Sequence, residues 1–215
     1  MIKMKKDKGL KIKSTIKEHV INNKKPYILT TLLFVIGIFL GVLFINNMQE
    51  AQKGETSSYL NQFIENLKNI EKLDQTALLQ TSLKQNIILA ITIWFFGTTV
   101  IGLPIVFGIV LYRGFCLGYT ISLCTYVLGM SKGMIFTSVS LILPSLLFIP
   151  ALLALAVSGF KLYQSIVKDK RKENIKIEII RHTIFSLVML GILAISSLVE
   201  ILIATNILKQ IIIYF

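Results

Sequence analysis

Four stretches of this chain are long and apolar enough to lie inside a lipid bilayer. Residues 27–45 and 87–112 carry no charged side chain, and residues 114–160 and 183–208 carry one each. A bilayer core about 30 Å thick is crossed by roughly 20 helical residues. Hydrophobic residues make up 54% of the chain and charged residues 16%, which leaves little material for a separate soluble domain. The chain is therefore predicted to be an integral membrane protein.

Basic residues gather in two segments that border apolar stretches, residues 1–26 and residues 161–182. Cytoplasmic segments of membrane proteins are rich in Lys and Arg, so both are predicted to be cytoplasmic. The intervening residues 46–86 hold four lysines against five acidic residues and are predicted to be external. The formal net charge of +12 is therefore assigned to contact with anionic membrane lipids and not to binding of nucleic acid.

Two cytoplasmic segments require an even number of membrane spans between them. The predicted fold is thus an all-α, polytopic membrane helix bundle of about five transmembrane helices, with a cytoplasmic N-terminus. Its first helix covers residues 27–45, its second to fourth cover 87–160, its fifth covers 183–208, and residues 209–215 are external. In this scheme Arg113 lies at a cytoplasmic connection between spans 87–112 and 114–130. The alternative makes 114–130 a re-entrant segment and moves 161–182 outside.

Three prolines interrupt the central spans, namely Pro104, Pro144 and Pro150. Proline removes a backbone hydrogen bond, and inside a membrane the freed carbonyl needs a partner from protein or water. A break or bend is predicted at Gly102-Leu103-Pro104. These positions are interpreted either as sites of ordinary helix packing or as the walls of a substrate path made by broken helices.

Glu200 is a carboxylate inside the predicted fifth span. Ionisable residues within membrane spans are costly and usually face a polar interior. The predicted partners are backbone groups near Pro144 or Pro150, or the basic side chains Arg113 and Lys132. Glu200 is interpreted as a packing hydrogen bond, as part of an ion or substrate path, or as a side chain that reaches the outer surface.

Residues 57–83 have the apolar spacing of an amphipathic external helix, in one or two pieces. Its apolar stripe consists of Tyr59, Phe63, Leu67 and Ile70, and Leu60 and Ile64 widen this stripe. This stripe is predicted to lie on lipid, to pack on the bundle or to dock a partner protein.

The chain carries no nucleophile elbow, phosphate-binding loop or zinc-protease motif. General acid–base catalysis needs positioned titratable groups, and no predicted span holds a cluster of them. The chain is therefore not expected to be an enzyme, and no catalytic residue, cofactor site or metal site is predicted.

The order of these segments resembles the stage II sporulation protein M family of endospore-forming bacteria. The resemblance runs over nearly the whole chain, from the basic N-terminus through one span, an external loop and further spans. Locally it rests on LYRGFCLGY at 111–119, LPSLLFIP at 143–150 and SLVE at 197–200.

The resemblance implies a non-catalytic, multi-pass protein of the cell membrane that is needed for engulfment of the forespore. It implies a location at the sporulation septum, where such a protein anchors two peptidoglycan-degrading partners, stage II sporulation proteins D and P. A small transporter or channel subunit, with kinked helices around Glu200, is the alternative function. Whether the chain forms a homo-oligomer is left open.

Overall fold

The structure is a computed structural model that describes residues 23–68, 75–168, 175–204 and 206–207. All regular secondary structure in these described ranges is helical, so the predicted all-α class is confirmed. The elements in chain order are α2 (Lys24–Asn46), α3 (Glu50–Lys68), α4 (Gln75–Gly97), α5 (Leu103–Leu128), α6 (Met130–Thr137), η2 (Ser138–Ile142), α7 (Leu143–Lys168), α8 (Ile175–Val199) and η4 (Glu200–Ala204). The two η elements are π-helical turns within longer helical runs.

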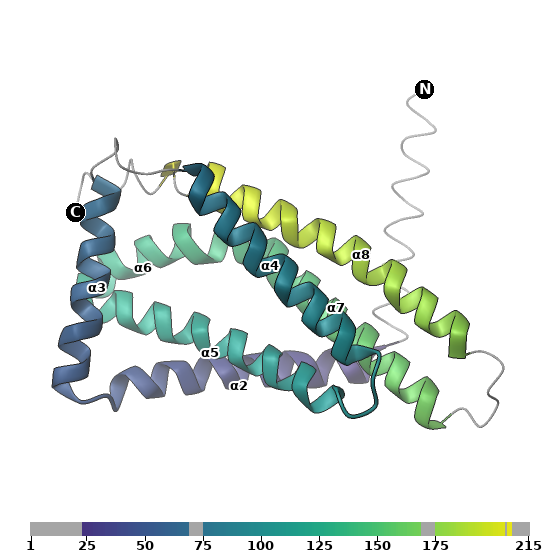
Figure 1. Cartoon of the computed structure of the whole chain (residues 1–215). Helices are drawn as coiled ribbons and strands as arrows, with labels where there is room; N and C mark the ends of the chain where they lie inside the picture. Colours follow the sequence, from purple (N-terminus) through teal and green to yellow (C-terminus); the bar gives the residue numbers. More distant parts are fainter. Residues whose placement is uncertain (1–22, 69–74, 169–174, 205, 208–215) are drawn as a thin grey trace, which may run out of the picture.

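Four helical runs in the described part of the chain are long and apolar enough to cross a bilayer. They are Lys24–Asn46, Leu103–Leu128, Met130–Val167 and Ile175–Leu202. The predicted count of five spans is therefore not confirmed. α4 is not among these four membrane-spanning candidates, because polar residues such as Lys84, Gln85 and Asn86 occupy its first half. It nevertheless runs along α8 and also contacts α7, as Figure 1 shows.

The helix boundaries between residues 87 and 130 differ from the prediction. The expected span 87–112 is broken, since α4 ends at Gly97 and α5 begins at Leu103. The break predicted at Gly102-Leu103-Pro104 is present, because Pro104 lies in the first turn of α5, where a missing N–H costs little. The connection predicted at Arg113 is wrong, because α5 continues through that residue to Leu128.

α5 ends instead at Gly129, whose φ of +81° favours glycine. From there α6, η2 and α7 run back along the bundle. Figure 1 places α3, the start of α4 and the α5–α6 turn at one end of the molecule. The start of α2, the turn after Gly97 and the start of α8 lie toward the other end. We call the first of these the α3 end.

α2 and α5 are joined by two matched pairs of glycines. Gly37 and Gly41 on α2 face α5, and Gly114 and Gly118 on α5 face α2. A Cβ atom at any of the four would overlap a backbone carbonyl of the opposite helix. Small residues four positions apart allow two membrane helices to approach closely enough for their backbones to touch. The first helix is thus fixed against the middle of the chain.

The apolar core lies where α4, α5, α7 and α8 meet. Side chains that are fully enclosed there include Ile93, Val106, Val110, Leu152, Leu155 and Leu193. Many other apolar side chains face outward, and Ile28 and Phe39 of α2 are 67% and 62% exposed. An exposed apolar surface of this kind suits a helix surrounded by lipid.

We predict that Gly118→Ala destabilises the protein by about 1–3 kcal/mol, because the added methyl group forces α2 and α5 apart. Gly108→Ala on the same helix is the matched control, because nothing lies within 4 Å of a Cβ built there. Thermal unfolding of both variants in detergent measures the difference. Equal melting temperatures would show that the two helices do not pack through these glycines.

We also predict that Gly54 and Ile101 lie on opposite sides of the membrane, because α4 separates α3 from the exposed turn at residue 101. The test uses Gly54→Cys or Ile101→Cys in a chain whose two native cysteines are serine. A membrane-impermeant thiol reagent should label the first in intact cells and the second after permeabilisation. Labelling of both from the same side would mean that α4 does not cross.

Candidate functional site

The external helix of the prediction corresponds to α3 followed by the beginning of α4. α3 is held against the bundle by Leu60 and Ile64, which pack with Cys124 of α5 and Phe136 of α6. Lys53 adds a contact, with its Nζ atom 5.5 Å from the centre of the Tyr126 ring. One edge of α3 is therefore attached to the rest of the protein.

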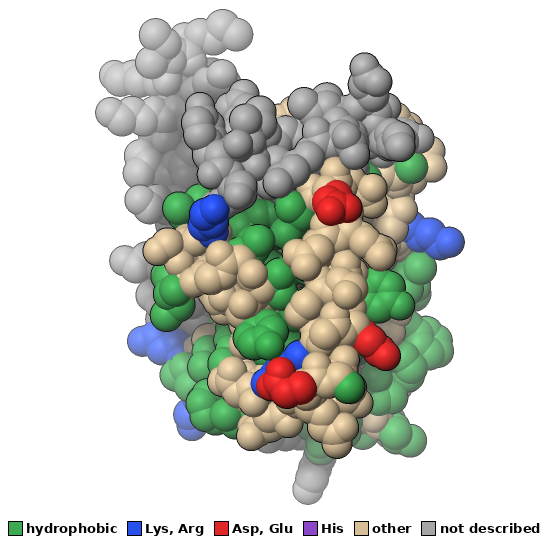
Figure 2. Space-filling model, turned by 90° about the vertical axis from the view of Figure 1, so that its left-hand side faces the viewer, with side chains coloured by type: hydrophobic (Ala, Val, Ile, Leu, Met, Phe, Trp, Pro, Cys, Tyr) green, Lys and Arg blue, Asp and Glu red, His purple; other side chains and the backbone are tan. Residues whose placement is uncertain are grey.

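The predicted stripe of α3 is attached only along one edge: Leu60 and Ile64, which widen the stripe, pack on the bundle, whereas Tyr59 and Phe63 do not. Tyr59 is 74% exposed and Phe63 is 44% exposed. The side chain of Leu67 and the whole of Ile70 lie outside the described residues. Figure 2 views the α3 end and shows a mainly polar surface with scattered acidic side chains and apolar ones between them. Two aromatic side chains are thus presented on a helix whose neighbouring edge is already packed.

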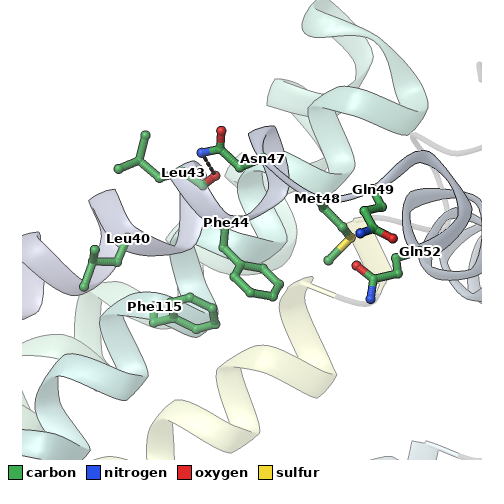
Figure 3. A pocket seen from close by; sticks show the side chains of 8 residues that line it. All are labelled: Leu40, Leu43, Phe44, Asn47, Met48, Gln49, Gln52 and Phe115. Carbon is green, nitrogen blue, oxygen red and sulfur yellow. Dashed lines mark hydrogen bonds between the residues drawn. The ribbon is translucent and has the colours of Figure 1, made fainter.

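A hollow of about 630 Å³ lies beside the beginning of α3, where α2 ends (Figure 3). Its walls are apolar on the side of α2 and α5 and carry amide side chains toward α3. The lining residues are Leu40, Leu43, Phe44, Asn47, Met48, Gln49, Gln52 and Phe115. Gln52, Tyr59 and Phe63 are spaced i, i+7 and i+11, which places them on one face of α3. Gln52, at the edge of the hollow, therefore lies on the same face of α3 as the two exposed aromatic residues.

A second, smaller cavity lies within the bundle, between α4, α5, α7 and α8. Its volume is about 190 Å³. Most of the side chains that line it are polar: Ser82, Gln85, Asn86, Arg113, Cys116, Thr120, Ser140, Ser145, Ser196 and Glu200, together with Leu117, Leu141, Pro144 and Phe148. We call it the polar cavity. It combines one basic and one acidic side chain with hydroxyl and amide groups from four helices.

Arg113 reaches the polar cavity from the interior of α5. Its guanidinium carbon lies 5.4 Å from the centre of the Phe148 ring on α7. A cation above an aromatic face is attracted by the ring quadrupole, and the attraction grows when water is excluded. Because the expected connection at Arg113 does not exist, this charge lies within a membrane helix and not at a cytoplasmic surface.

Glu200 is the first residue of η4 and accepts a hydrogen bond from Ser82, with 2.7 Å between Ser82 Oγ and the carboxylate oxygen. The sequence did not predict this partner, because Ser82 had been assigned to the external segment. The backbone near Pro144 was a predicted partner of Glu200. The Pro144 carbonyl oxygen instead accepts a hydrogen bond from Ser196 Oγ, at 3.0 Å.

Asn86, one helical turn after Ser82, connects α4 to α8 by hydrogen bonds. Its Nδ2 atom donates to Ser197 Oγ at 2.7 Å and to the Leu193 carbonyl at 3.3 Å. The sequence contains a signal that could have predicted this contact. Ser82, Asn86, Ile93 and Gly97 recur at helical intervals, and this pattern runs across the predicted boundary at residue 86. Asn86, Ile93 and Gly97 are buried.

Two π-helical turns border the polar cavity. η2 contributes Ser140 and comes just before Pro144, and η4 begins with Glu200. π-turns are rare and often occur at functional sites. Of the five predicted intramembrane positions, Arg113, Pro144 and Glu200 meet at this cavity. The other two lie elsewhere: Pro104 at the start of α5 and Pro150, which is exposed, within α7.

The polar cavity offers hydrogen-bond donors, one acceptor carboxylate and one cation. Among the described residues there is no group of three or more His, Cys, Asp or Glu side chains that could hold a metal ion. The arrangement is suited to holding a polar group inside the membrane.

Comparison with known protein families identifies a matching family. A model of the family described as stage II sporulation protein M matches residues 30–205. The chain belongs to the stage II sporulation protein M family. This membership, together with the four apolar helical runs in the described part of the chain, indicates a sporulation-related membrane protein. No curated protein and no solved structure gave a match.

For this member of the stage II sporulation protein M family, we predict that Asn86→Ala lowers the free energy of unfolding by about 1–2 kcal/mol, because two hydrogen bonds between α4 and α8 are lost. Thr81→Ala is the control, since the Thr81 hydroxyl bonds to the Ala77 carbonyl of its own helix. Thermal unfolding in detergent is the measurement. A loss of stability in Thr81→Ala as large as that in Asn86→Ala would contradict the assignment.

Proposed function

We propose that this protein is a non-catalytic membrane scaffold of endospore formation. It holds peptidoglycan-degrading proteins at the septal membrane and is required there for engulfment of the forespore. Stage II sporulation proteins D and P are the partners that the family resemblance suggests. In this proposal α3 lies on the outer side of the membrane, where the cell wall is.

The observation that carries the proposal is that one face of α3 is packed on the bundle while the adjacent face is exposed. Leu60 and Ile64 attach the helix to the bundle, while Tyr59 and Phe63 on the adjacent face remain exposed. Aromatic side chains are enriched among the residues that contribute most to binding between proteins. A helix that is already fixed loses little further freedom when a partner covers its free face.

A protein partner explains the free face of α3 better than a lipid surface does. α3 carries Glu50, Glu55 and Glu65, which are exposed at the α3 end. Anionic lipid headgroups attract basic segments and repel acidic ones. The hollow beside Gln52 lies at the beginning of this face and offers apolar walls with amide groups at their edge.

The advantage of such a scaffold is effective concentration. Tethering two proteins on one platform turns their meeting into an intramolecular event. Enzymes held at the membrane also act where the wall lies against it, so the scaffold needs no reaction of its own.

We predict that Tyr59→Glu/Phe63→Glu abolishes recovery of wall hydrolases when the tagged protein is purified from sporulating cells in mild detergent. The physical reason is that two charges replace the exposed aromatic surface. Ser58→Glu/Gln62→Glu is the matched control, because both positions are exposed, have the same spacing and lie one residue earlier on α3.

Both variants must reach the membrane at the level of the wild-type protein. The proposal expects hydrolases with the wild type and the control, and their loss with the aromatic variant. Recovery of hydrolases with all three would place the contact elsewhere, and recovery with none would refute the scaffold as stated.

Transport is a second candidate function, favoured by the polar cavity between broken and kinked helices. Under that function Glu200→Gln should block engulfment while the α3 variant has little effect. The scaffold proposal expects the reverse, since the amide can still accept the hydrogen bond from Ser82.

A further inference from the structure

We propose that the polar cavity binds a zwitterion, with an anionic phosphate-type group toward Arg113 and an ammonium group toward Glu200. The phosphoethanolamine group has this chemistry, either as the head of a phospholipid or as a free molecule. The proposal requires neither that wall hydrolases bind to α3 nor that a solute crosses the membrane.

The first argument is that charges of opposite sign line one cavity. Arg113 comes from α5 and Glu200 from η4, and both border the same 190 Å³. Each charge inside a membrane carries a cost of several kcal/mol by most estimates, and such residues usually mark the path or binding site of a ligand. Two charges on the wall of one cavity indicate a ligand that carries both signs.

The second argument is the spacing of the two charges along the bundle. Arg113 contacts Phe148, and Pro144, one turn nearer the α3 end of α7, contacts Ser196 of α8. Glu200 lies one further turn toward the α3 end. Two helical turns correspond to about 11 Å of backbone along the axis, which the two long side chains shorten. The cation is thus deep and the carboxylate is nearer the α3 end.

This order matches a phospholipid of the leaflet nearer the α3 end whose headgroup enters the cavity from the side and keeps its orientation in the bilayer. In phosphatidylethanolamine the phosphate lies closer to the acyl chains than the ammonium does. The phosphate would therefore come to lie at the level of the deeper Arg113, and the ammonium at the level of Glu200. A simple anion would be attracted by Arg113 but repelled by Glu200, and a simple cation would meet the opposite pair of forces.

The third argument is the size and lining of the cavity. A water molecule occupies about 30 Å³ in the liquid, so the volume holds several waters or one small polar group. Drug-sized ligands use sites of roughly 300–1,000 Å³, which are larger and mostly apolar. The hydroxyl groups of Ser140 and Ser145 add donors around the space between the charges, and Thr120 Oγ1, which donates to the Cys116 carbonyl at 2.9 Å, adds an acceptor.

The reactivity of the Cys116 thiol can report whether the polar cavity is occupied. It lines the polar cavity, whereas Cys124 is fully buried among α3, α5 and α6. The full-length protein with Cys124→Ser, in nanodiscs of phosphatidylglycerol, is allowed to react with N-ethylmaleimide. The rate of Cys116 alkylation is measured with added glycerophosphoethanolamine, glycerophosphoglycerol or ethanolamine at equal concentration. A parallel series replaces part of the phosphatidylglycerol with phosphatidylethanolamine.

The expected result is that a zwitterionic compound slows alkylation at least about tenfold more than the anion or the cation alone, a factor that corresponds to one strong charge contact. Slowing by free glycerophosphoethanolamine identifies a soluble ligand. Slowing by phosphatidylethanolamine alone identifies the lipid headgroup. Equal effects of all compounds, or no effect of any, would overturn the proposal.

Arg113→Gln and Glu200→Gln should each abolish the protection, and Glu178→Gln should retain it, because Glu178 lies at the far end of α8 beside Arg181. Native mass spectrometry of the wild-type protein is the second measurement and does not depend on the reactivity of Cys116. It should find phosphatidylethanolamine retained in preference to phosphatidylglycerol. Equal retention of the two lipids, without protection of Cys116, would refute the site.

Discussion

The bundle depends on a constraint that the membrane imposes on α4. Its first half is polar, and polar groups placed in hydrocarbon must find partners within the protein. Asn86 and Ser82 find theirs on α8 and η4, and this keeps α4 packed against α7 and α8 even though its composition falls short of a typical span. The same contacts bring Glu200 to the cavity that Arg113 enters from α5.

Helices with few polar groups cannot be held in the bundle by hydrogen bonds, and here they are held by glycine contacts. α2 carries no charged residue after Lys25 and is mostly apolar, so burial of apolar surface does not favour a helix neighbour over lipid. α2 and α5 are instead attracted to each other by close backbone contact at Gly37, Gly41, Gly114 and Gly118. The first helix and the polar centre are thus connected through one element, α5, which carries two of these glycines and Arg113.

The sequence was sufficient for the helical class, the family and the break at Pro104, because proline chemistry and apolar length are local properties. It placed Arg113 at a connection, since a lone charge between two apolar runs usually marks a helix end. It also assigned Ser82 and Asn86 to the external loop, because average polarity hides the periodicity of a helix with one buried polar face. On α3 the apolar stripe was recognised, but its attached edge, Leu60 and Ile64, could be separated from Tyr59 and Phe63 by tertiary contacts alone.

The most direct test of the account is cross-linking of α4 to α8 in the native membrane. Asn86→Cys/Ser197→Cys, in a chain whose native cysteines are serine, puts thiols on two residues whose side chains contact each other directly, with 2.7 Å between Asn86 Nδ2 and Ser197 Oγ. Mild oxidation should form an intramolecular disulfide, whereas Thr81→Cys/Ser197→Cys, with an outward-facing position on α4, should not. Absence of the first disulfide, or equal yields from both pairs, would contradict the placement of α4 inside the bundle and, with it, the polar cavity.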